Sequence, residues 1–224
     1  MNLADKIIIA DDHPLFREAL RQAVERVCPG CEIVEAEDLT SLQAVTDAHP
    51  NADLLLLDLH MPGVNGFSGL IYVRSHQATL PTVVVSALEE TWVIQRARGH
   101  GAAGFIPKSA PVRVIAEAMQ TVLEGERWFP PGTEGGALDP LESDIAERIA
   151  QLTPQQFRVL MLLSEGLLNK QIAFEMSVSE ATVKAHVTAI MKKLKVNNRT
   201  QAVLEAARLT VKPPKLDPAS LEQA

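Results

Sequence analysis

Long hydrophobic runs are absent from this sequence, and their absence argues against a membrane-spanning chain. No apolar stretch approaches the roughly 18 residues that a transmembrane helix needs. The amino-terminal segment has no basic flank and reaches Asp11 and Asp12 too soon for a secretory signal. We also find no internal repeat and no low-complexity tract. The sequence therefore predicts a cytoplasmic protein that has no membrane partner.

Cysteine is also scarce, because the only two cysteines lie in the turn Cys28-Pro29-Gly30-Cys31. A zinc site would need further ligands, and the sequence has no third cysteine. A redox pair needs a thiolate stabilised at the amino end of a helix. This pair instead follows a helical pattern, where the helix dipole disfavours negative charge. We therefore favour a reduced turn over a redox or metal role.

Basic residues are few in the front of the chain and concentrated toward its end. Residues 1–130 hold 10 Lys and Arg against 17 Asp and Glu, and residues 131–150 hold 1 against 5. Residues 151–212 reverse the balance, with 9 against 4, and the last twelve residues hold 1 against 2. An acidic front half joined to a basic back half predicts nucleic acid as a partner of the back half only. A merely solvated basic face would give the same charge.

The first 125 residues alternate between strand and helix patterns. Strand patterns cover residues 6–10, 31–36, 54–58, 81–87 and 102–108. Helical patterns cover residues 14–27, 41–48, 67–77, 90–100 and 112–123. Five strand–helix units at this spacing predict an α/β domain, in which helices cover both faces of a doubly wound, five-stranded parallel sheet.

Beyond residue 125 the alternation ends. Residues 126–150 are rich in Pro and Gly and predict a linker, in which Leu141–Ile149 is a candidate short helix. Residues 151–212 show only helical patterns and predict a small all-α domain, and residues 213–224 form a tail. Thr153 and Ser179 are predicted N-caps, as is Thr200 for the last helix. Two short helices joined by a tight turn at residues 177–178 predict a helix-turn-helix.

The stretch from Leu54 to Gly66 carries the most informative single residue, Asp58. Four leucines run directly into this aspartate, and a Pro-Gly turn follows. So short and uninterrupted an apolar run is typical of a strand buried on both faces of a parallel sheet. Asp58 is then expected at the carboxyl edge, where open α/β sheets bind ligands. A single carboxylate there could serve as a metal ligand, a base or a nucleophile.

Polar residues also follow the other strands of the predicted sheet. They are Asp11 and Asp12 after the first strand, Ser86 at the fourth and Lys108 after the fifth. Because the carboxyl ends of parallel strands share one edge, these residues are expected to converge. Three carboxylates together favour a hard cation such as Mg²⁺. A carboxylate can alternatively accept a phosphoryl group, which Lys108 and Ser86 could then contact.

These residues give the front half a clear family resemblance. The ADDHP pair, the DLHMPG turn, Ser86 in VVVSA and Lys108 in GFIPKSA resemble a response-regulator receiver domain, whose fold is flavodoxin-like. The stretch from LTPQQF to NNRTQAV resembles the LuxR/NarL-type helix-turn-helix. Together the two resemblances cover nearly the whole chain outside the linker and the tail.

The receiver resemblance implies a role for each residue. Asp58 would be the phosphorylated residue, and Asp11, Asp12 and the backbone carbonyl of His60 would bind Mg²⁺. Ser86 would be the hydroxyl switch residue, and Lys108 would match the family's lysine. Phe105 occupies the position of a rotating aromatic switch residue that is often tyrosine. Because phenylalanine lacks the hydroxyl group, a switch here would act by packing alone.

The helix-turn-helix resemblance implies contacts with double-stranded DNA. A recognition helix places its amino-terminal residues on bases, while lysines and hydroxyl groups contact phosphates. The likeness assigns base contacts to Lys184, Ala185 and Thr188. Candidates nearer the DNA backbone are Asn169, Lys170, Ser179, Thr182 and Lys192. The sequence departs from the family at Gln156, where glutamate is usual, which removes a charge near a helix start.

The resemblance as a whole implies a phosphorylation-controlled transcriptional regulator of a two-component system, not an enzyme. A cognate sensor histidine kinase would be the phosphodonor. The receiver would cover the recognition helix until phosphorylation, and the activated protein would bind DNA as a homodimer. Two alternatives stay open. One is a phosphatase-type hydrolase, which usually has a second acid where this chain has His60. The other is a DNA binder that uses its receiver only for docking.

Overall fold

The predicted five-stranded parallel sheet is confirmed. A computed structural model describes residues 3–211. All neighbouring strands of the sheet run parallel, in the order β2-β1-β3-β6-β7. Their bounds are β1 Lys6–Ala10, β2 Glu32–Ala36, β3 Leu54–Asp58, β6 Thr82–Ser86 and β7 Gly104–Pro107. The strand order reverses between β1 and β3, which places a topological switch point beside the carboxyl end of β3.

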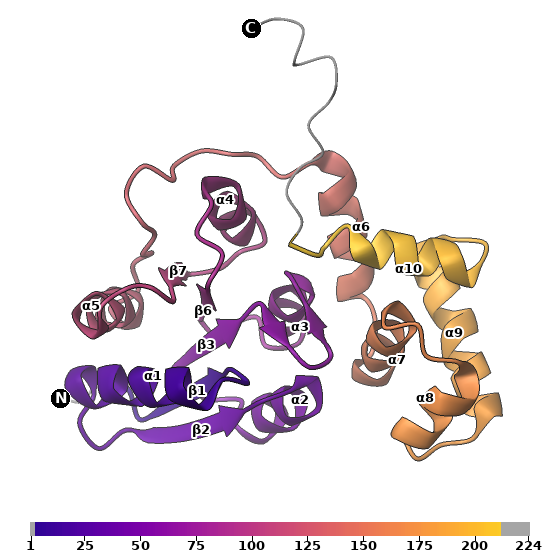
Figure 1. The fold of residues 1–224 in the computed structure, drawn as a ribbon, viewed down its shortest axis with the longest axis horizontal. Helices are drawn as coiled ribbons and strands as arrows, with labels where there is room; N and C mark the ends of the chain where they lie inside the picture. Colours follow the sequence, from indigo (N-terminus) through magenta and orange to yellow (C-terminus); the bar gives the residue numbers. More distant parts are fainter. Residues whose placement is uncertain (1–2, 212–224) are drawn as a thin grey trace, which may run out of the picture.

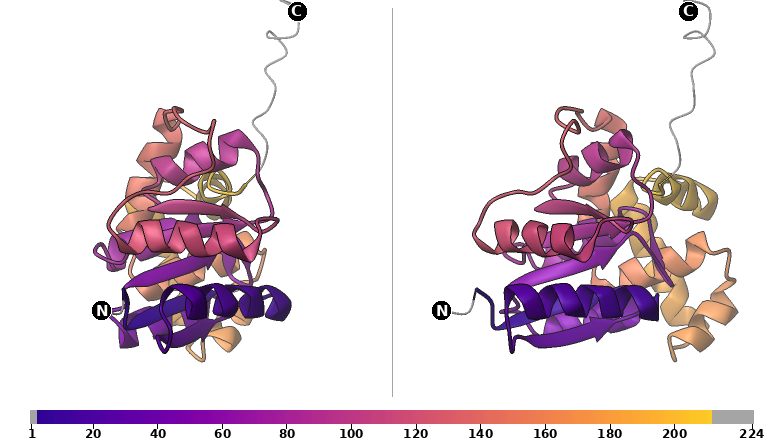
Figure 2. Two further views of the ribbon diagram at one scale, coloured as in Figure 1. Left: turned by 90° about the vertical axis from the view of Figure 1, so that its left-hand side faces the viewer. Right: turned by 60° about the vertical axis from the view of Figure 1, so that its left-hand side comes forward.

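Helices cover both faces of this sheet, as the fold class requires (Figures 1 and 2). One face carries α1 (Pro14–Val27) and α5 (Val112–Leu123), which lie side by side in Figure 2. The other carries α2 (Leu39–Ala48), α3 (Ser68–His76) and α4 (Thr91–Gly99). Strand β3 contributes side chains to the hydrophobic cores on both faces of the sheet, since Leu55 and Leu57 pack on one face and Leu54 and Leu56 on the other. This explains its uninterrupted leucines.

A small hairpin that the sequence patterns did not predict follows β3 directly. Strands β4 (His60–Met61) and β5 (Val64–Asn65) pair antiparallel immediately after Asp58. Two-residue strands are too short to show an alternating pattern, so periodicity could not reveal them. Gly63 has φ +75° at the turn, a conformation that favours glycine.

The helical domain contains α7 (Pro154–Ser164), α8 (Asn169–Glu175), α9 (Glu180–Leu194) and α10 (Arg199–Ala207). Thr153 and Ser179 cap α7 and α9 as predicted. The prediction of Thr200 as a cap is wrong, because the Asn198 side chain accepts from the backbone N–H of Gln201 and α10 starts two residues earlier. Gln156 completes the capping box of α7 by accepting from the Thr153 N–H. Glutamine therefore retains the hydrogen bond there without the charge.

The segment between the two domains contains ordered structure. Trp128 forms an isolated bridge with Gly104, which extends the sheet beyond β7 by one residue. The short helix expected at Leu141–Ile149 is present as α6 (Pro140–Ala150), which packs on both α3 and α9. The domain limits at residues 125, 150 and 212 stay a prediction, and the tail at residues 213–224 lies outside the described residues. Within residues 3–211, none of the helices is long and apolar enough to cross a membrane.

Candidate functional site

Three strands bring Asp11, Asp58 and Lys108 together at the carboxyl edge of the sheet. Lys108 Nζ lies 2.7 Å from Asp11 Oδ2 and 2.8 Å from Asp58 Oδ2. Both aspartates are buried, with 0% of Asp11 and 3% of Asp58 exposed. Asp58 is the last residue of β3, and Asp11 and Lys108 directly follow β1 and β7, so the sheet topology alone brings them into contact. One ammonium group thus bridges two buried carboxylates.

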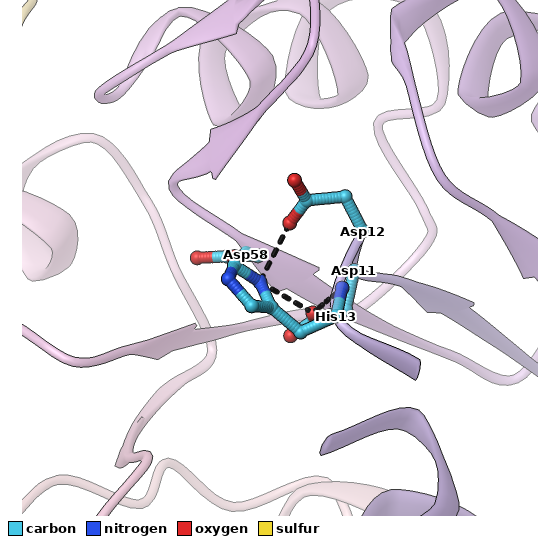
Figure 3. Close-up of side chains that lie close together, drawn as sticks. All are labelled: Asp11, Asp12, His13 and Asp58. Atoms are coloured by element: carbon cyan, nitrogen blue, oxygen red, sulfur yellow. Dashed lines mark hydrogen bonds and ion pairs between the residues drawn. The ribbon is translucent and has the colours of Figure 1, made fainter. Parts of the chain in front are cut away.

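Asp12 and His13 complete this group on its open side (Figure 3). His13 Nδ1 lies 2.7 Å from Asp12 Oδ1 and 3.4 Å from Asp11 Oδ1. One ligand atom from each of Asp11, Asp12, His13 and Asp58 can be chosen so that all four lie within 4.8 Å of one another. We call Asp11, Asp12, Asp58 and Lys108 the carboxylate site.

The carboxylate site holds more negative than positive charge. Burial raises the pKa of Asp58, the charge of Asp11 adds to the rise, and the contact with Lys108 only partly opposes it. Burial would lower the pKa of Lys108, but its bonds to Asp11 and Asp58 outweigh that effect and raise it. Three carboxylates around one ammonium group leave room for another cation. Oxygen donors this close fit a hard divalent ion such as Mg²⁺.

The predicted switch residues lie behind the carboxylate site. Ser86 is fully buried at the end of β6, and its Oγ accepts a hydrogen bond from the backbone N–H of Leu88. Its carbonyl accepts from the N–H of Lys108, which joins the ends of β6 and β7. Phe105 is fully buried in the core beneath α4. His60 donates its backbone N–H to Asp58 Oδ1 at 3.2 Å, whereas metal binding by its carbonyl stays a prediction.

A cavity of about 650 Å³ opens beside Asp58. Its lining is mainly apolar; the lining residues are His13, Leu15, Phe16, Asp58, His60, Ala87, Leu88 and Lys108. The side chain of Phe16 also packs against Lys108, whose Nζ lies 4.9 Å from the ring centroid. A phosphorylated group can therefore reach the buried Asp58 from this side.

The residues predicted to contact DNA are mostly exposed on the helical domain. Lys184, Ala185, Thr188 and Lys192 are exposed along α9. Lys170 on α8 is also exposed, as are Ser179 and Thr182 at the start of α9. The side chains of Ser179 and Thr182 hydrogen-bond to each other at 2.9 Å while Ser179 caps the helix. Asn169 is half-buried and accepts from Arg199, so it is the most engaged member of the set.

The expectation that the α/β domain covers the recognition helix is wrong for this structure. The α/β domain packs on α6 and α7, through α3 and α2. Figure 1 shows α8 and α9 on the side of the helical domain that faces away from the sheet. Because the α/β domain packs on other helices, Lys184, Ala185 and Thr188 stay exposed.

A second charged cluster, which the sequence did not predict, joins the two parts of the chain. We call Arg96, His100 and Glu142 the Glu142 cluster. Glu142 Oε1 lies 2.8 Å from Arg96 Nη2 and 2.5 Å from His100 Nε2. Burial would raise the pKa of Glu142, but the bonds and charges of His100 and Arg96 outweigh it and lower the pKa. The partners are more than 40 residues apart in sequence, so no local pattern could have shown them.

The same arginine holds the end of α10. Arg96 donates to the carbonyls of Arg208 and Thr210, at 2.8 and 3.2 Å. The backbone N–H of Phe67 donates to the carbonyl of Leu209 at 2.9 Å. Gly66 permits this approach, because a Cβ at its φ of +60° would lie 2.8 Å from the Cα of Thr210. The loop that begins at Asp58 therefore ends in contact with the helical domain.

Comparisons with known proteins agree with this architecture. Residues 7–120 match the family model described as response regulator receiver domain. Residues 150–206 match the model described as bacterial regulatory proteins, luxR family. A Pseudomonas putida protein named glycerol metabolism activator is 43% identical over 208 residues, which cover 90% of this chain and 94% of that one. A probable transcriptional regulatory protein NarL of Mycobacterium tuberculosis strain H37Rv is 32% identical, with coverage of 91% and 94%.

Solved structures show the same likeness. RcsB from Salmonella enterica serovar Typhimurium, bound to a promoter in the presence of the phosphomimetic BeF3⁻, has a TM-score of 0.53 and 25% identity. The match covers 92% of this chain and 100% of that one. The receiver domain of the Mycobacterium tuberculosis NarL matches with a TM-score of 0.50 and 31% identity, over 55% of this chain and 98% of that one. The chain belongs to the response regulators, in the group that joins a receiver domain to a luxR-family domain.

Proposed function

We propose that Asp58 accepts a phosphoryl group from a cognate sensor histidine kinase and that this controls DNA binding by the helical domain. The observation that carries the proposal is the placement of Asp58. Its carboxylate is buried and shares the Lys108 ammonium group with Asp11, yet it lines an open cavity large enough for a phosphorylated side chain. A carboxylate in that position can act as a nucleophile and form an aspartyl-phosphate.

The residues around Asp58 divide the work of this transfer. An oxygen of Asp58 would bond to the phosphorus atom while the bond to the kinase histidine breaks. Lys108 would pair with the oxygens of the transferred group, since its Nζ already contacts Asp58. Asp11, Asp12, Asp58 and the carbonyl of His60 would hold Mg²⁺, which, when bound, offsets the negative charge of the phosphoryl group. No substrate outside the signalling pair is needed, so we infer a regulator and not a metabolic enzyme.

The new charge would be sensed by Ser86 and the loop that leads away from Asp58. Ser86 can turn its hydroxyl group toward a phosphoryl oxygen, which changes its present bond to the Leu88 N–H. Movement in the β6–α4 connection would reach Arg96 on α4 and His100, which directly follows that helix. Phe105 would follow by repacking, because its side chain carries no polar group. Control would therefore pass through the Glu142 cluster and the end of α10.

The helical domain would bind double-stranded DNA with its exposed α9 face. We propose base contacts from Lys184, Ala185 and Thr188 and backbone contacts from Asn169, Lys170, Ser179, Thr182 and Lys192. The exposure of all of them except the half-buried Asn169, and the basic charge of residues 151–212, support this assignment. The solved RcsB structure in complex with a promoter shows that a protein of similar fold binds DNA. A homodimer on activation and a cytoplasmic location complete the proposal.

The phosphorylation half of the proposal is tested with a small-molecule phosphodonor and intact-mass measurement. Wild-type protein is expected to gain one phosphoryl group in the presence of Mg²⁺, and Asp58→Asn none. Asp53→Asn is a matched control, because Asp53 precedes the same strand at its opposite end. Equal phosphorylation of wild type and Asp58→Asn would contradict the assignment.

The DNA-binding half is tested by selecting bound sequences from genomic fragments and measuring affinity at several salt concentrations. Lys184→Ala is expected to weaken specific binding by about 1–3 kcal/mol, whereas Lys192→Ala should reduce the salt slope by about 1. Arg26→Ala, an exposed change on α1, is the control. Asp58→Asn should no longer respond to the phosphodonor. If it responded like wild type, the receiver would serve only for docking.

A narrower candidate function comes from the Pseudomonas putida relative. At 43% identity over most of both chains, its printed name, glycerol metabolism activator, supports a role for this chain as an activator of genes for glycerol use. Transcript levels in a deletion strain on glycerol would test it. Unchanged transcripts would leave the phosphorylation mechanism intact and remove this target assignment.

A further inference from the structure

We propose that His13 is a nitrogen ligand of the metal in the carboxylate site and gives that site a preference for first-row transition ions over Mg²⁺. The inference rests on the proposed function insofar as the metal site is the one beside Asp58. It adds a ligand that the family's carboxylate and carbonyl set does not include.

The position of the imidazole supports this role. His13 Nδ1 lies 2.7 Å from Asp12 Oδ1 and 3.4 Å from Asp11 Oδ1. Figure 3 shows the ring on the side of the cluster where Asp12 lies, and all four residues offer donors within 4.8 Å of one another. Two metal–ligand bonds of about 2.1 Å span about 4.2 Å. A small inward movement would therefore bring the nitrogen and the carboxylate oxygens onto one ion.

The imidazole of His13 contacts the carboxylates of the site and not the helix that it precedes. It is the N-cap residue of α1, yet its side chain makes no capping hydrogen bond. Its backbone does the local work instead: the N–H donates to Asp11 Oδ1, and the carbonyl accepts from the N–H groups of Phe16 and Arg17. Pro14 opens the helix with its φ already suited to it. The imidazole is therefore not needed to cap α1, and its ion-pair contacts are with Asp11 and Asp12 of the site.

The chemistry of a mixed donor set favours a particular class of ion. Carboxylate and carbonyl oxygens suit Mg²⁺ and Mn²⁺, whereas an imidazole nitrogen suits ions such as Ni²⁺ and Zn²⁺. Asp11 and Asp58 supply the negative charge that any divalent ion needs, since their two carboxylates share the single ammonium group of Lys108. Loss of His13 should therefore weaken transition ions selectively and leave Mg²⁺ binding nearly unchanged.

The test measures binding of Mg²⁺ and Ni²⁺ separately to the full chain by calorimetry at a single, slightly alkaline pH. Mn²⁺ then serves as a spin probe for a directly bound nitrogen. Wild type should bind Ni²⁺ more tightly than Mg²⁺ and show nitrogen coupling to Mn²⁺. His13→Asn keeps a good N-cap residue and removes the imidazole. This variant should show no nitrogen coupling to Mn²⁺, and its affinity for Ni²⁺ should fall at least about tenfold.

His60→Ala is the matched control, because His60 lines the same cavity but is expected to contribute only its backbone. It should retain both the nitrogen coupling and the Ni²⁺ affinity. The proposal is overturned if wild type shows no coupling, if His13→Asn retains it, or if His60→Ala loses it. Ni²⁺ binding that survives Asp12→Asn would place the ion elsewhere and also overturn it. Failure of wild type to bind Mg²⁺ would instead contradict the Mg²⁺ role in the proposed function.

Discussion

Asp58 and Glu142 are both buried carboxylates that contact cations, yet their pKa values shift in opposite directions. The pKa of Asp58 is raised, because burial and Asp11 outweigh Lys108. The pKa of Glu142 is lowered, because His100 and Arg96 outweigh burial. The carboxylate site thus has an excess of negative charge, whereas the Glu142 cluster has none. An unbalanced cluster attracts a ligand, and a balanced one holds two elements together.

Exposure sharpens the same distinction. The carboxylate site lines an open cavity, so a metal ion or phosphoryl group can complete it. The Glu142 cluster lies between α4 and α6, with His100 only 2% exposed in its side chain. Its hydrogen bonds are already satisfied by Arg96 and His100. We therefore expect the stability of carboxylate-site variants to depend on an added metal ion. Variants of the Glu142 cluster should instead weaken the packing of α6 on α4.

The largest effect is expected from Lys108→Met, which removes the ammonium group between Asp11 and Asp58. Two buried carboxylates would then lack their shared cation, and the free energy of unfolding should fall by roughly 3–5 kcal/mol in metal-free buffer. Mg²⁺ should restore part of this loss, because it supplies the missing positive charge. Urea denaturation with and without Mg²⁺ measures both effects.

Lys192→Met is the control for this comparison, because Lys192 is exposed on α9 and forms no ion pair among residues 3–211. Its change should stay within about 0.5 kcal/mol. An equal loss in both variants, or no response of Lys108→Met to Mg²⁺, would show that the carboxylate site is not short of positive charge.

A smaller effect is expected from Glu142→Ala, which leaves Arg96 and His100 without their carboxylate. Arg96 retains the carbonyls of Arg208 and Thr210, so we expect a loss of about 2–3 kcal/mol. The DNA affinity of the variant should also respond less to the phosphodonor than that of wild type, because the bonds that join α4 to α6 are lost. Thermal unfolding and affinity measurements with and without phosphodonor check the two outcomes.

Asp144→Ala is a matched change on the same helix. Asp144 pairs with Arg148 at the surface, with its side chain 50% exposed, and such pairs contribute less than about 1 kcal/mol. If the two variants lost equal stability, the burial of the Glu142 cluster would have no energetic consequence. If only stability changed and DNA binding did not, the cluster would be a structural joint without a part in control.

The carboxylate site could be predicted from the sequence, whereas the Glu142 cluster could not. The residues of the carboxylate site lie at the ends of strands, and the carboxyl ends of parallel strands share one edge of the sheet. The five apolar runs in the sequence were therefore enough to predict that these residues converge. Arg96 and Glu142 lie on helices whose mutual packing no periodicity records. The β4–β5 hairpin was missed because its strands have two residues each. The exposure of α9 likewise depends on how the two domains pack together, which no sequence pattern records. The expectation that the receiver covers the recognition helix was wrong for this reason.

The smallest effect is the pH dependence of the Glu142 cluster. The pKa of the Glu142 carboxyl group is lower in the folded state than its ordinary value of 4.5. Between these two values the unfolded chain binds more protons than the folded chain, so the free energy of unfolding rises with pH. The stabilisation is therefore complete above pH 4.5 and is lost as pH falls through the folded pKa. The difference in stability between wild type and Glu142→Gln should shrink as pH falls over that window.

The raised pKa of Asp58 predicts the opposite slope: with a chelator present, wild type should lose stability relative to Asp58→Asn as pH rises above 3.8. Parallel slopes for the two variants would mean that the clusters do not differ in charge balance.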